Sequence, residues 1–285
     1  MNYTTLISTD TLTPHLGEAD WAVIDARFSL ADTEQGRRAY EAAHIPGAIY
    51  AHLDEDLSGP IIRGHTSRHP LPDVATLVET FSTWGIDAGV QVVVYDDANG
   101  SIASRLWWML RWLGHEAVAV LDGGIARWQA EGRPVKRGTE TRAARTFTPE
   151  IHSEMVASAD EVNAVRQQAE YRVVDSRAAN RYRGEDETLD PVAGHIPGAV
   201  CSPFGANVGP DGRFLPADEI RVRLEDVLAG RDPSQTIFYC GSGVTAAHNV
   251  LAMEYAGLSG SRLYAGSWSE WITDPDRPVA TGPNP

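Results

Sequence analysis

The sequence has little of what marks secreted, metal-binding or membrane proteins. Its 285 residues include only two cysteines, Cys201 and Cys240, which excludes a disulfide-stapled scaffold. No CxxC or cysteine–histidine spacing is present, so we expect no metal. No apolar run approaches the ~18 residues of a membrane-spanning helix. The opening residues, MNYTTLISTDTLTPHL, lack the basic start and apolar core of a secretory signal.

Positive charge is also scarce. Lysine and arginine number 24 against 39 acidic residues, and the formal net charge is −15. This balance argues against nucleic acid or an anionic membrane as a partner. It is still compatible with a small anionic substrate, because a local site can oppose the overall sign of charge. With no address signal in the sequence, we expect a cytoplasmic protein.

What the chain does contain is an internal duplication. Four segments of the first half return in the same order in the second. The pairs are VIDAR (23–27) and VVDSR (173–177), AHIPGA (43–48) and GHIPGA (194–199), YD (95–96) and YC (239–240), and GGIARW (123–128) and GSWSEW (266–271). An ordered set of this kind indicates a duplicated domain. We place the domains at 1–140 and 157–285, with a polar linker at 141–156.

Within each half, short apolar strands alternate with amphipathic helices. In the second half the pattern predicts helices over 159–168, 217–229 and 245–257, and strands over 171–176, 235–240 and 261–266. Apolar strands separated by helices are typical of a parallel sheet covered on both faces. The predicted fold class is therefore α/β, present twice.

Cys240 closes one of these predicted strands, at the sheet edge where α/β proteins bind ligands. Gly241, Ser242, Gly243, Val244 and Thr245 follow, and a helix is predicted to begin near Thr245. The glycines allow a tight loop whose backbone N–H groups turn inward, and a helix start adds further unpaired donors. Such surroundings lower a cysteine pKa from ~8.5 toward roughly 3.5–7.5. Cys240 is thus a candidate thiolate nucleophile, and the N–H groups of its loop can also bind an anion.

The alternative is that Cys240 is a small buried hydrophobe at the end of a core strand. The duplication favours the nucleophile. The matching residue of the first half is Asp96, so only the second copy has a cysteine at this position, and we expect the first copy to be inactive. Cys201 has no glycine loop or helix start beside it, and we interpret it as a core residue. His44 and His195 occur in both copies of HIPGA, and we expect structural roles for them.

Together, the tandem halves, the D-x-R strand ends, the two HIPGA segments and the single CGSGVTA loop resemble the rhodanese-type sulfurtransferases. The resemblance covers nearly the whole chain. It implies two tandem rhodanese-like domains, each a parallel five-stranded sheet flanked by helices, with a catalytic C-terminal copy and a site between the domains. It also implies a reaction that needs no cofactor: Cys240 takes a sulfane sulfur from a small anionic donor as a persulfide and passes it to cyanide or a thiol.

The loop sequence resembles the 3-mercaptopyruvate enzymes more than the animal thiosulfate enzymes, which carry basic residues after the cysteine. That resemblance implies that Ser242 works with Asp54 and His69 as a proton relay. It also implies that Arg181 binds the donor carboxylate. The family's second such arginine falls at Asp190, a departure for which Arg183 is a candidate replacement. The donor is left open between 3-mercaptopyruvate and thiosulfate.

Two other functions share parts of this pattern. Cysteine phosphatases place an arginine six residues after the cysteine, where this chain has Ala246, and no basic residue lies between Cys240 and Ala247. The other alternative is a non-enzymatic persulfide carrier or regulatory module. Such a carrier has no need of the Asp54, His69 and Ser242 relay, so the sequence favours the enzyme.

Overall fold

The computed structural model describes residues 2–285 and divides the chain into two compact units. The N-terminal unit comprises Met1–Gly59, Pro72–His152 and Val208–Phe214. The C-terminal unit comprises Pro60–Leu71, Ser153–Asn207 and Leu215–Pro285. Each unit therefore takes in a short segment from the opposite half of the sequence, which the repeat pattern does not predict.

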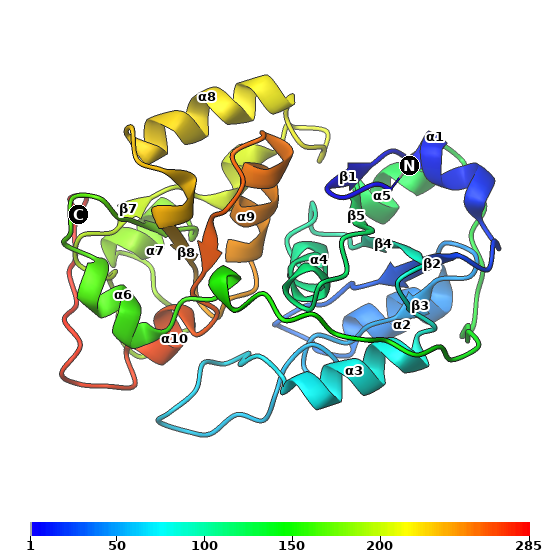
Figure 1. The fold of residues 1–285 in the computed structure, drawn as a ribbon, viewed down its shortest axis with the longest axis horizontal. Helices are drawn as coiled ribbons and strands as arrows, with labels where there is room; N and C mark the ends of the chain where they lie inside the picture. Colours follow the sequence, from blue (N-terminus) through cyan, green and yellow to red (C-terminus); the bar gives the residue numbers. More distant parts are fainter. Residues whose placement is uncertain (1) are drawn as a thin grey trace. The chain divides into compact units, whose positions relative to one another are not determined.

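The N-terminal unit is built on a parallel five-stranded sheet in the order β1-β5-β4-β2-β3 (Figure 1). Its elements are β1 (Leu6–Ile7), α1 (Thr9–Leu12), η1 (Thr13–His15), β2 (Trp21–Asp25), α2 (Gln35–Ala42), β3 (Ile49–Tyr50), α3 (Val74–Thr83), β4 (Gln91–Tyr95), α4 (Ala103–Trp112), β5 (Val118–Leu121) and α5 (Gly124–Ala130). Every residue of β4 is buried, as expected of a central strand in a sheet covered on both faces. Alternate β4 residues Val93 and Tyr95 pack with α5 residues Ile125 and Trp128.

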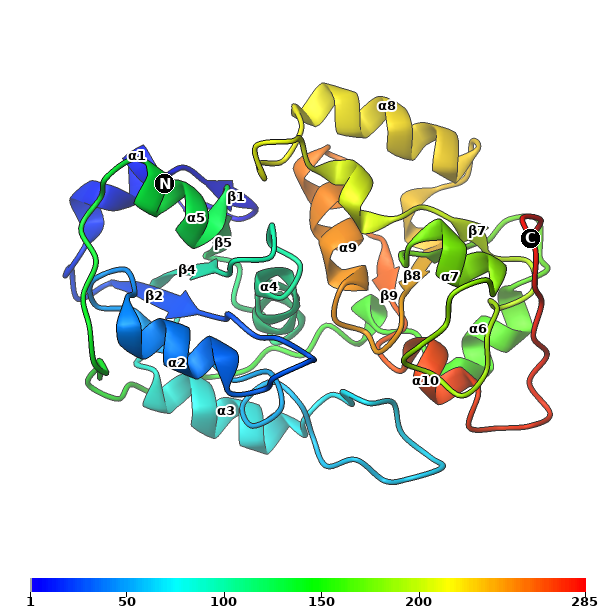
Figure 2. The ribbon, with the colours of Figure 1, turned by 180° about the vertical axis from the view of Figure 1, so that it is seen from behind.

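The C-terminal unit has a parallel sheet in the order β7-β6-β8-β9. Its elements are η2 (Ser153–Met155), α6 (Ala159–Val165), β6 (Arg172–Asp175), α7 (Ala179–Arg183), β7 (Val200–Cys201), η3 (Phe204–Asn207), α8 (Ala217–Leu228), η4 (Pro233–Gln235), β8 (Thr236–Tyr239), α9 (Ala246–Tyr255), β9 (Arg262–Leu263) and α10 (Ser267–Trp271). Helices α6 and α10 pack on one side of β8, while α9 lies beside α8 (Figures 1 and 2). The α/β class is confirmed in both units.

The predicted fifth strand of the C-terminal sheet is reduced to one residue pair. Val156 forms a single parallel bridge with Leu263, at the edge where β1 pairs with β5 in the other unit. The Ala157 N–H donates to the Leu263 carbonyl at 2.9 Å, but the chain then turns into α6 and forms no ladder. Within the described residues this sheet therefore has four strands, not the five expected.

The repeated motifs hold the same structural positions in both units. His44 and His195 are fully buried, and each Nδ1 lies 2.8 Å from a backbone carbonyl, that of Tyr40 or of Tyr182. Their expected structural role is confirmed. Among residues 2–285, no helix combines the length and hydrophobicity needed to cross a bilayer.

Candidate functional site

Cys240 follows β8 directly, and its sulfur faces the loop that leads into α9. The Gly243 N–H donates to Cys240 Sγ at 3.2 Å. Gly243 has φ +79°, and a Cβ there would lie 2.0 Å from the Ala265 carbonyl oxygen, so only glycine allows this turn. The side chain of Cys240 is 2% exposed, and the thiol is therefore held away from bulk water.

Two opposing effects act on the thiol. Burial disfavours the charged thiolate and by itself raises the pKa of Cys240. Hydrogen bonds from the Thr245 hydroxyl and from the backbone N–H groups of Ser242, Ala246 and Gly243 favour the thiolate. The bonds outweigh burial and bring the pKa of Cys240 below its usual value. Burial dominates at Cys201 and raises its pKa to about 11.

Ser267 supports the cysteine from the start of α10. The Cys240 N–H donates to Ser267 Oγ at 3.0 Å, and the serine hydroxyl donates to the Tyr264 carbonyl at 2.9 Å. Ser267 has φ +54°, a left-handed conformation that is costly for a residue with a side chain. The matching residue of the first half, Gly124, has φ +55°. Sequence reasoning missed this role of Ser267.

His69 and Ser242 are brought together by the structure. Ser242 Oγ lies 2.8 Å from His69 Nδ1, and both side chains are buried. His69 reaches this position because residues 60–71 form part of the C-terminal unit. Two of the three relay candidates are therefore hydrogen-bonded to each other beside the cysteine loop.

Asp54 belongs to the N-terminal unit and is solvent-exposed. Its backbone N–H donates to His52 Nδ1 at 3.2 Å. Partial burial raises the pKa of its carboxyl, while nearby His52 acts in the opposite direction. Its membership of the relay stays a prediction.

Arg181 lies on α7 and extends toward the cysteine loop. A Cβ placed on Gly241 would lie 3.6 Å from both Nη atoms of Arg181. Glu187 accepts Arg181 Nε at 3.0 Å and Nη2 at 2.8 Å, and Asp190 accepts Nη2 at 3.2 Å. The guanidinium is thus fixed by two carboxylates that are each only 2% exposed.

Arg68 is a second guanidinium at the same place, and sequence reasoning missed it. Its Nη2 would lie 3.0 Å from a Cβ on Gly241, and its Nη1 donates to Asp190. Asp190, the position where the family resemblance implies an arginine, therefore holds both Arg68 and Arg181. Burial and the neighbouring Arg181 lower the pKa of Arg68, against the opposing effect of Cys240.

The remaining candidates take different positions. Arg183 pairs with exposed Glu185, its Nε donating at 2.6 Å, so the structure places it in a surface ion pair. Val244 accepts the Ala247 N–H and so begins the first turn of α9. Arg177 donates to Asp175 within its own unit.

In the N-terminal unit, the matching loop is occupied by a side chain of the protein itself. Asp96 follows β4, and its carboxylate accepts four backbone N–H groups at 2.8–2.9 Å. The donors are Ala98, Gly100, Ile102 and Ala103. In the N-terminal unit the N–H groups of this loop therefore bind the carboxylate of Asp96, whereas the corresponding loop of the C-terminal unit surrounds the thiol of Cys240.

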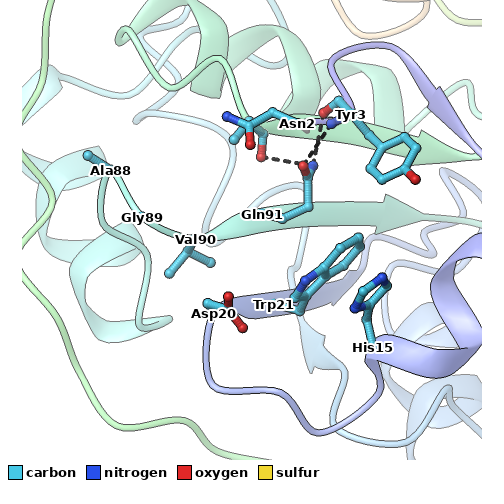
Figure 3. A pocket seen from close by; sticks show the side chains of 10 residues that line it. Asn2, Tyr3, His15, Asp20, Trp21, Ala88, Gly89, Val90 and Gln91 are labelled. Atoms are coloured by element: carbon cyan, nitrogen blue, oxygen red, sulfur yellow. Dashed lines mark hydrogen bonds between the residues drawn. The ribbon is translucent and has the colours of Figure 1, made fainter.

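A cavity of about 460 Å³ opens at the opposite edge of the N-terminal sheet, where β2 and β4 begin (Figure 3). Two of its polar side chains, Gln91 and His15, have partners within the protein. Gln91 Oε1 accepts the Tyr3 N–H at 2.9 Å, and His15 stacks on Trp21 with ring centroids 3.9 Å apart. No cysteine is among its lining residues, so the candidate nucleophile lies elsewhere.

A strand-end thiol with a lowered pKa, in a loop of N–H donors without basic residues, defines a class of protein: enzymes that transfer sulfur through cysteine. The duplicated parallel sheets narrow the class further. The chain belongs to the rhodanese family, since the rhodanese-like domain matches residues 8–131 and again 158–274. It is a sulfurtransferase that acts on a sulfur donor and a sulfur acceptor.

Similar proteins carry sulfurtransferase names. A probable 3-mercaptopyruvate sulfurtransferase of Pseudomonas aeruginosa is 47% identical over 283 residues, covering 99% of this chain and 100% of the relative. A thiosulfate/3-mercaptopyruvate sulfurtransferase of Arabidopsis thaliana is 32% identical, covering 96% of this chain and 86% of the relative. The crystal structure of SseA from Escherichia coli, a 3-mercaptopyruvate sulfotransferase, has a TM-score of 0.80 at 30% identity and covers 94% of this chain and 100% of that chain.

Proposed function

We propose that Cys240 takes a sulfane sulfur from 3-mercaptopyruvate or thiosulfate and passes it, as a persulfide, to cyanide or a thiol. The observation that carries the proposal is the Cys240 thiol at the end of β8, which accepts the Gly243 N–H at 3.2 Å. Donors of this kind lower the pKa of Cys240 and so increase its reactive thiolate fraction. The names of the relatives support 3-mercaptopyruvate as the donor. The loop sequence supports it as well, because it resembles that of the 3-mercaptopyruvate enzymes and lacks the basic residues that follow the cysteine in animal thiosulfate enzymes.

With 3-mercaptopyruvate, the Cys240 thiolate attacks the donor sulfur and forms an S–S bond while the carbon–sulfur bond breaks. The electron pair of the broken bond remains on carbon as the pyruvate enolate. The proton of the donor thiol moves to that carbon, so the products are pyruvate and an anionic persulfide. The His69–Ser242 pair is proposed to carry this proton, and the hydrogen bond of 2.8 Å between their side chains supports this role.

In the second half-reaction, cyanide or a thiolate attacks the outer persulfide sulfur. The S–S bond breaks, its electron pair returns to Cys240, and the product is thiocyanate or a new persulfide. The same N–H donors stabilise both anionic forms of the cysteine, and ping-pong kinetics follow from this cycle. A non-enzymatic carrier is not favoured, because the relatives are named as enzymes.

The N-terminal domain, which we place at 1–140, is proposed to be inactive because it has Asp96 in place of a cysteine and the Asp96 carboxylate occupies the N–H donors of the loop. We also propose a cytoplasmic location. The two cysteines are both free thiols, which is usual for proteins of a reducing compartment and supports this location.

The test combines two substitutions with two donors. Cys240→Ser is expected to reduce thiocyanate formation to background and to prevent the gain of one sulfur atom on the Cys240 peptide, seen by mass spectrometry. Ser242→Ala should reduce kcat/KM for 3-mercaptopyruvate more than for thiosulfate, because only the former requires proton delivery. Cys201→Ser is the control. Retention of activity in Cys240→Ser contradicts the proposed nucleophile, and equal losses in Ser242→Ala contradict the relay.

A further inference from the structure

Asn249 lies in the first turn of α9 and joins that helix to the ends of two strands. Its side chain is fully buried. The Asn249 Nδ2 group donates to Ser176 Oγ at 2.9 Å and to the Ser202 carbonyl at 2.9 Å. Ser176 directly follows β6 and Ser202 directly follows β7, at the same edge of the sheet at which Cys240 follows β8. One buried amide therefore links the helix that begins beside the thiol to two neighbouring strands.

Other polar side chains fix the orientation of this amide. Asn207 Nδ2 donates to Asn249 Oδ1 at 2.8 Å. Arg223, on α8, donates in turn to Asn207 Oδ1 and, at 2.9 Å, to Ser202 Oγ. The oxygen and the NH₂ group of Asn249 are thus all bonded inside the protein, as a buried amide requires.

The three positions of this crosslink are apolar in the N-terminal unit. The equivalent pairs are Ser176 and Ala26, Ser202 and Ala51, and Asn249 and Leu106. In the first pair each backbone N–H donates to the last residue of β8 or β4, and in the second pair to the last residue of β6 or β2. The residues of the third pair each lie three positions after the first residue of α9 or α4. Of the two copies, the one with the cysteine has polar side chains at these positions.

The two copies hold the start of their helices in different ways. The Asp96 carboxylate accepts the Ile102 N–H at 2.8 Å and the Ala103 N–H at 2.9 Å, so the bound anion itself fixes the start of α4. Cys240 offers a single sulfur atom, and sulfur is a weak hydrogen-bond acceptor. The start of α9 therefore needs a tie from outside its loop, and Asn249 supplies one.

We propose that Asn249 is a positioning residue that, through its bonds to Ser176 and Ser202, holds the start of α9 against Cys240. This inference rests on the proposed function, because it concerns the same cysteine. The donors that favour the Cys240 thiolate include the Thr245 hydroxyl and the Ala246 N–H, which belong to this helix start. Residue 240 carries one sulfur atom as a thiolate and two as a persulfide, and the crosslink keeps these donors in place in both states.

The first test is a titration of the Cys240 thiolate by ultraviolet absorbance in Asn249→Leu, which copies the residue of the first half. Release of the helix start weakens the hydrogen bonds from Thr245 and Ala246. The pKa of Cys240 should therefore rise by about one unit, and kcat/KM at a pH below that pKa should fall roughly 10-fold. Cys240→Ser serves as the blank.

Two further variants separate positioning from stability. Ser176→Ala/Ser202→Ala/Asn249→Leu copies all three apolar residues of the N-terminal unit, where they are fully buried, and it should show the same rise in pKa. Val162→Ala is the matched control. It removes two methyl groups from a fully buried residue of α6 and lowers stability without removing any bond of the crosslink, so its Cys240 pKa should equal that of the wild-type protein.

The outcomes distinguish this proposal from the proposed function. If Asn249→Leu or the triple variant is folded by circular dichroism and titrates like the wild-type protein, the positioning role is overturned. An equal pKa shift in Val162→Ala, or a triple variant that does not fold, also overturns it, because the crosslink would then serve stability alone. The titration needs no sulfur donor. The proposed function fails separately if the wild-type protein gains no sulfur on Cys240, measured by mass spectrometry, after incubation with 3-mercaptopyruvate or thiosulfate.

Discussion

Removal of the Thr245 hydroxyl should raise the pKa of Cys240. The threonine hydroxyl is the largest of the effects that favour the thiolate over the thiol, and burial is the effect that opposes it. Thr245→Val keeps the shape of the side chain and removes this donor. Thr245 is the N-cap of α9 but makes no side-chain capping bond, so the substitution removes no cap interaction.

The size of the shift follows from the bond that is lost. A hydrogen bond to a charged group contributes about 1.5–3 kcal/mol, and one pKa unit corresponds to about 1.36 kcal/mol. Cys240 is almost completely screened from bulk water, so solvent compensates little. We therefore expect the pKa of Cys240 to rise by about one to two units in Thr245→Val. Because the thiolate is the reactive form, the acid limb of the kcat/KM profile should move to higher pH by the same amount.

The assay is a pH titration of the thiolate by ultraviolet absorbance, with Cys240→Ser as the blank. Cys201 does not interfere, because burial raises its pKa to about 11. Thr245→Ser retains the hydroxyl and should titrate like the wild-type protein. A Thr245→Val protein with the wild-type pKa would refute the argument that side-chain and backbone donors, acting together, overcome burial.

Two further predictions concern stability. Ser267→Ala leaves the buried Cys240 N–H without its acceptor and should lower the free energy of unfolding by about 1–3 kcal/mol. Ser267→Gly loses the same bond but relieves the left-handed strain, so in urea denaturation it should be about 1–2 kcal/mol more stable than Ser267→Ala. Asp96→Asn replaces one acceptor oxygen by an NH₂ group facing two backbone N–H donors, and a loss of about 2–4 kcal/mol is expected in the same assay. Wild-type stability in either set would refute the corresponding hydrogen-bond argument.

The elements around Cys240 were predictable because their signals are local. The apolar run at 235–240 and the small residues after it predict a strand, a tight loop and a helix, and the structure has β8 and α9 at these positions. The duplicated segments predicted a repeated α/β fold for the same reason. Both inferences need only short stretches of sequence and no knowledge of the contacts between distant residues.

Arg68 could not be found in this way. The segment GPIIRGHTSRHPL around it has neither helical nor strand periodicity, and its place in the C-terminal unit depends on long-range contacts. The same limit applies to Asp190, whose position in the sequence suggested a missing arginine rather than a carboxylate that accepts from both Arg68 and Arg181. For Ser267 a signal did exist, since it replaces Gly124 of the first copy, but the left-handed backbone that gives the exchange its meaning is visible only in the structure.

The excursion of residues 60–71 into the C-terminal unit has a consequence for the duplication itself. The second copy keeps its cysteine loop, but the histidine bonded to that loop is encoded in the first copy. A polypeptide cut at the junction of the halves would separate Cys240 from His69, the proposed relay residue, although each piece would contain the strands of its own sheet. The second copy taken alone would therefore lack the histidine that hydrogen-bonds its cysteine loop.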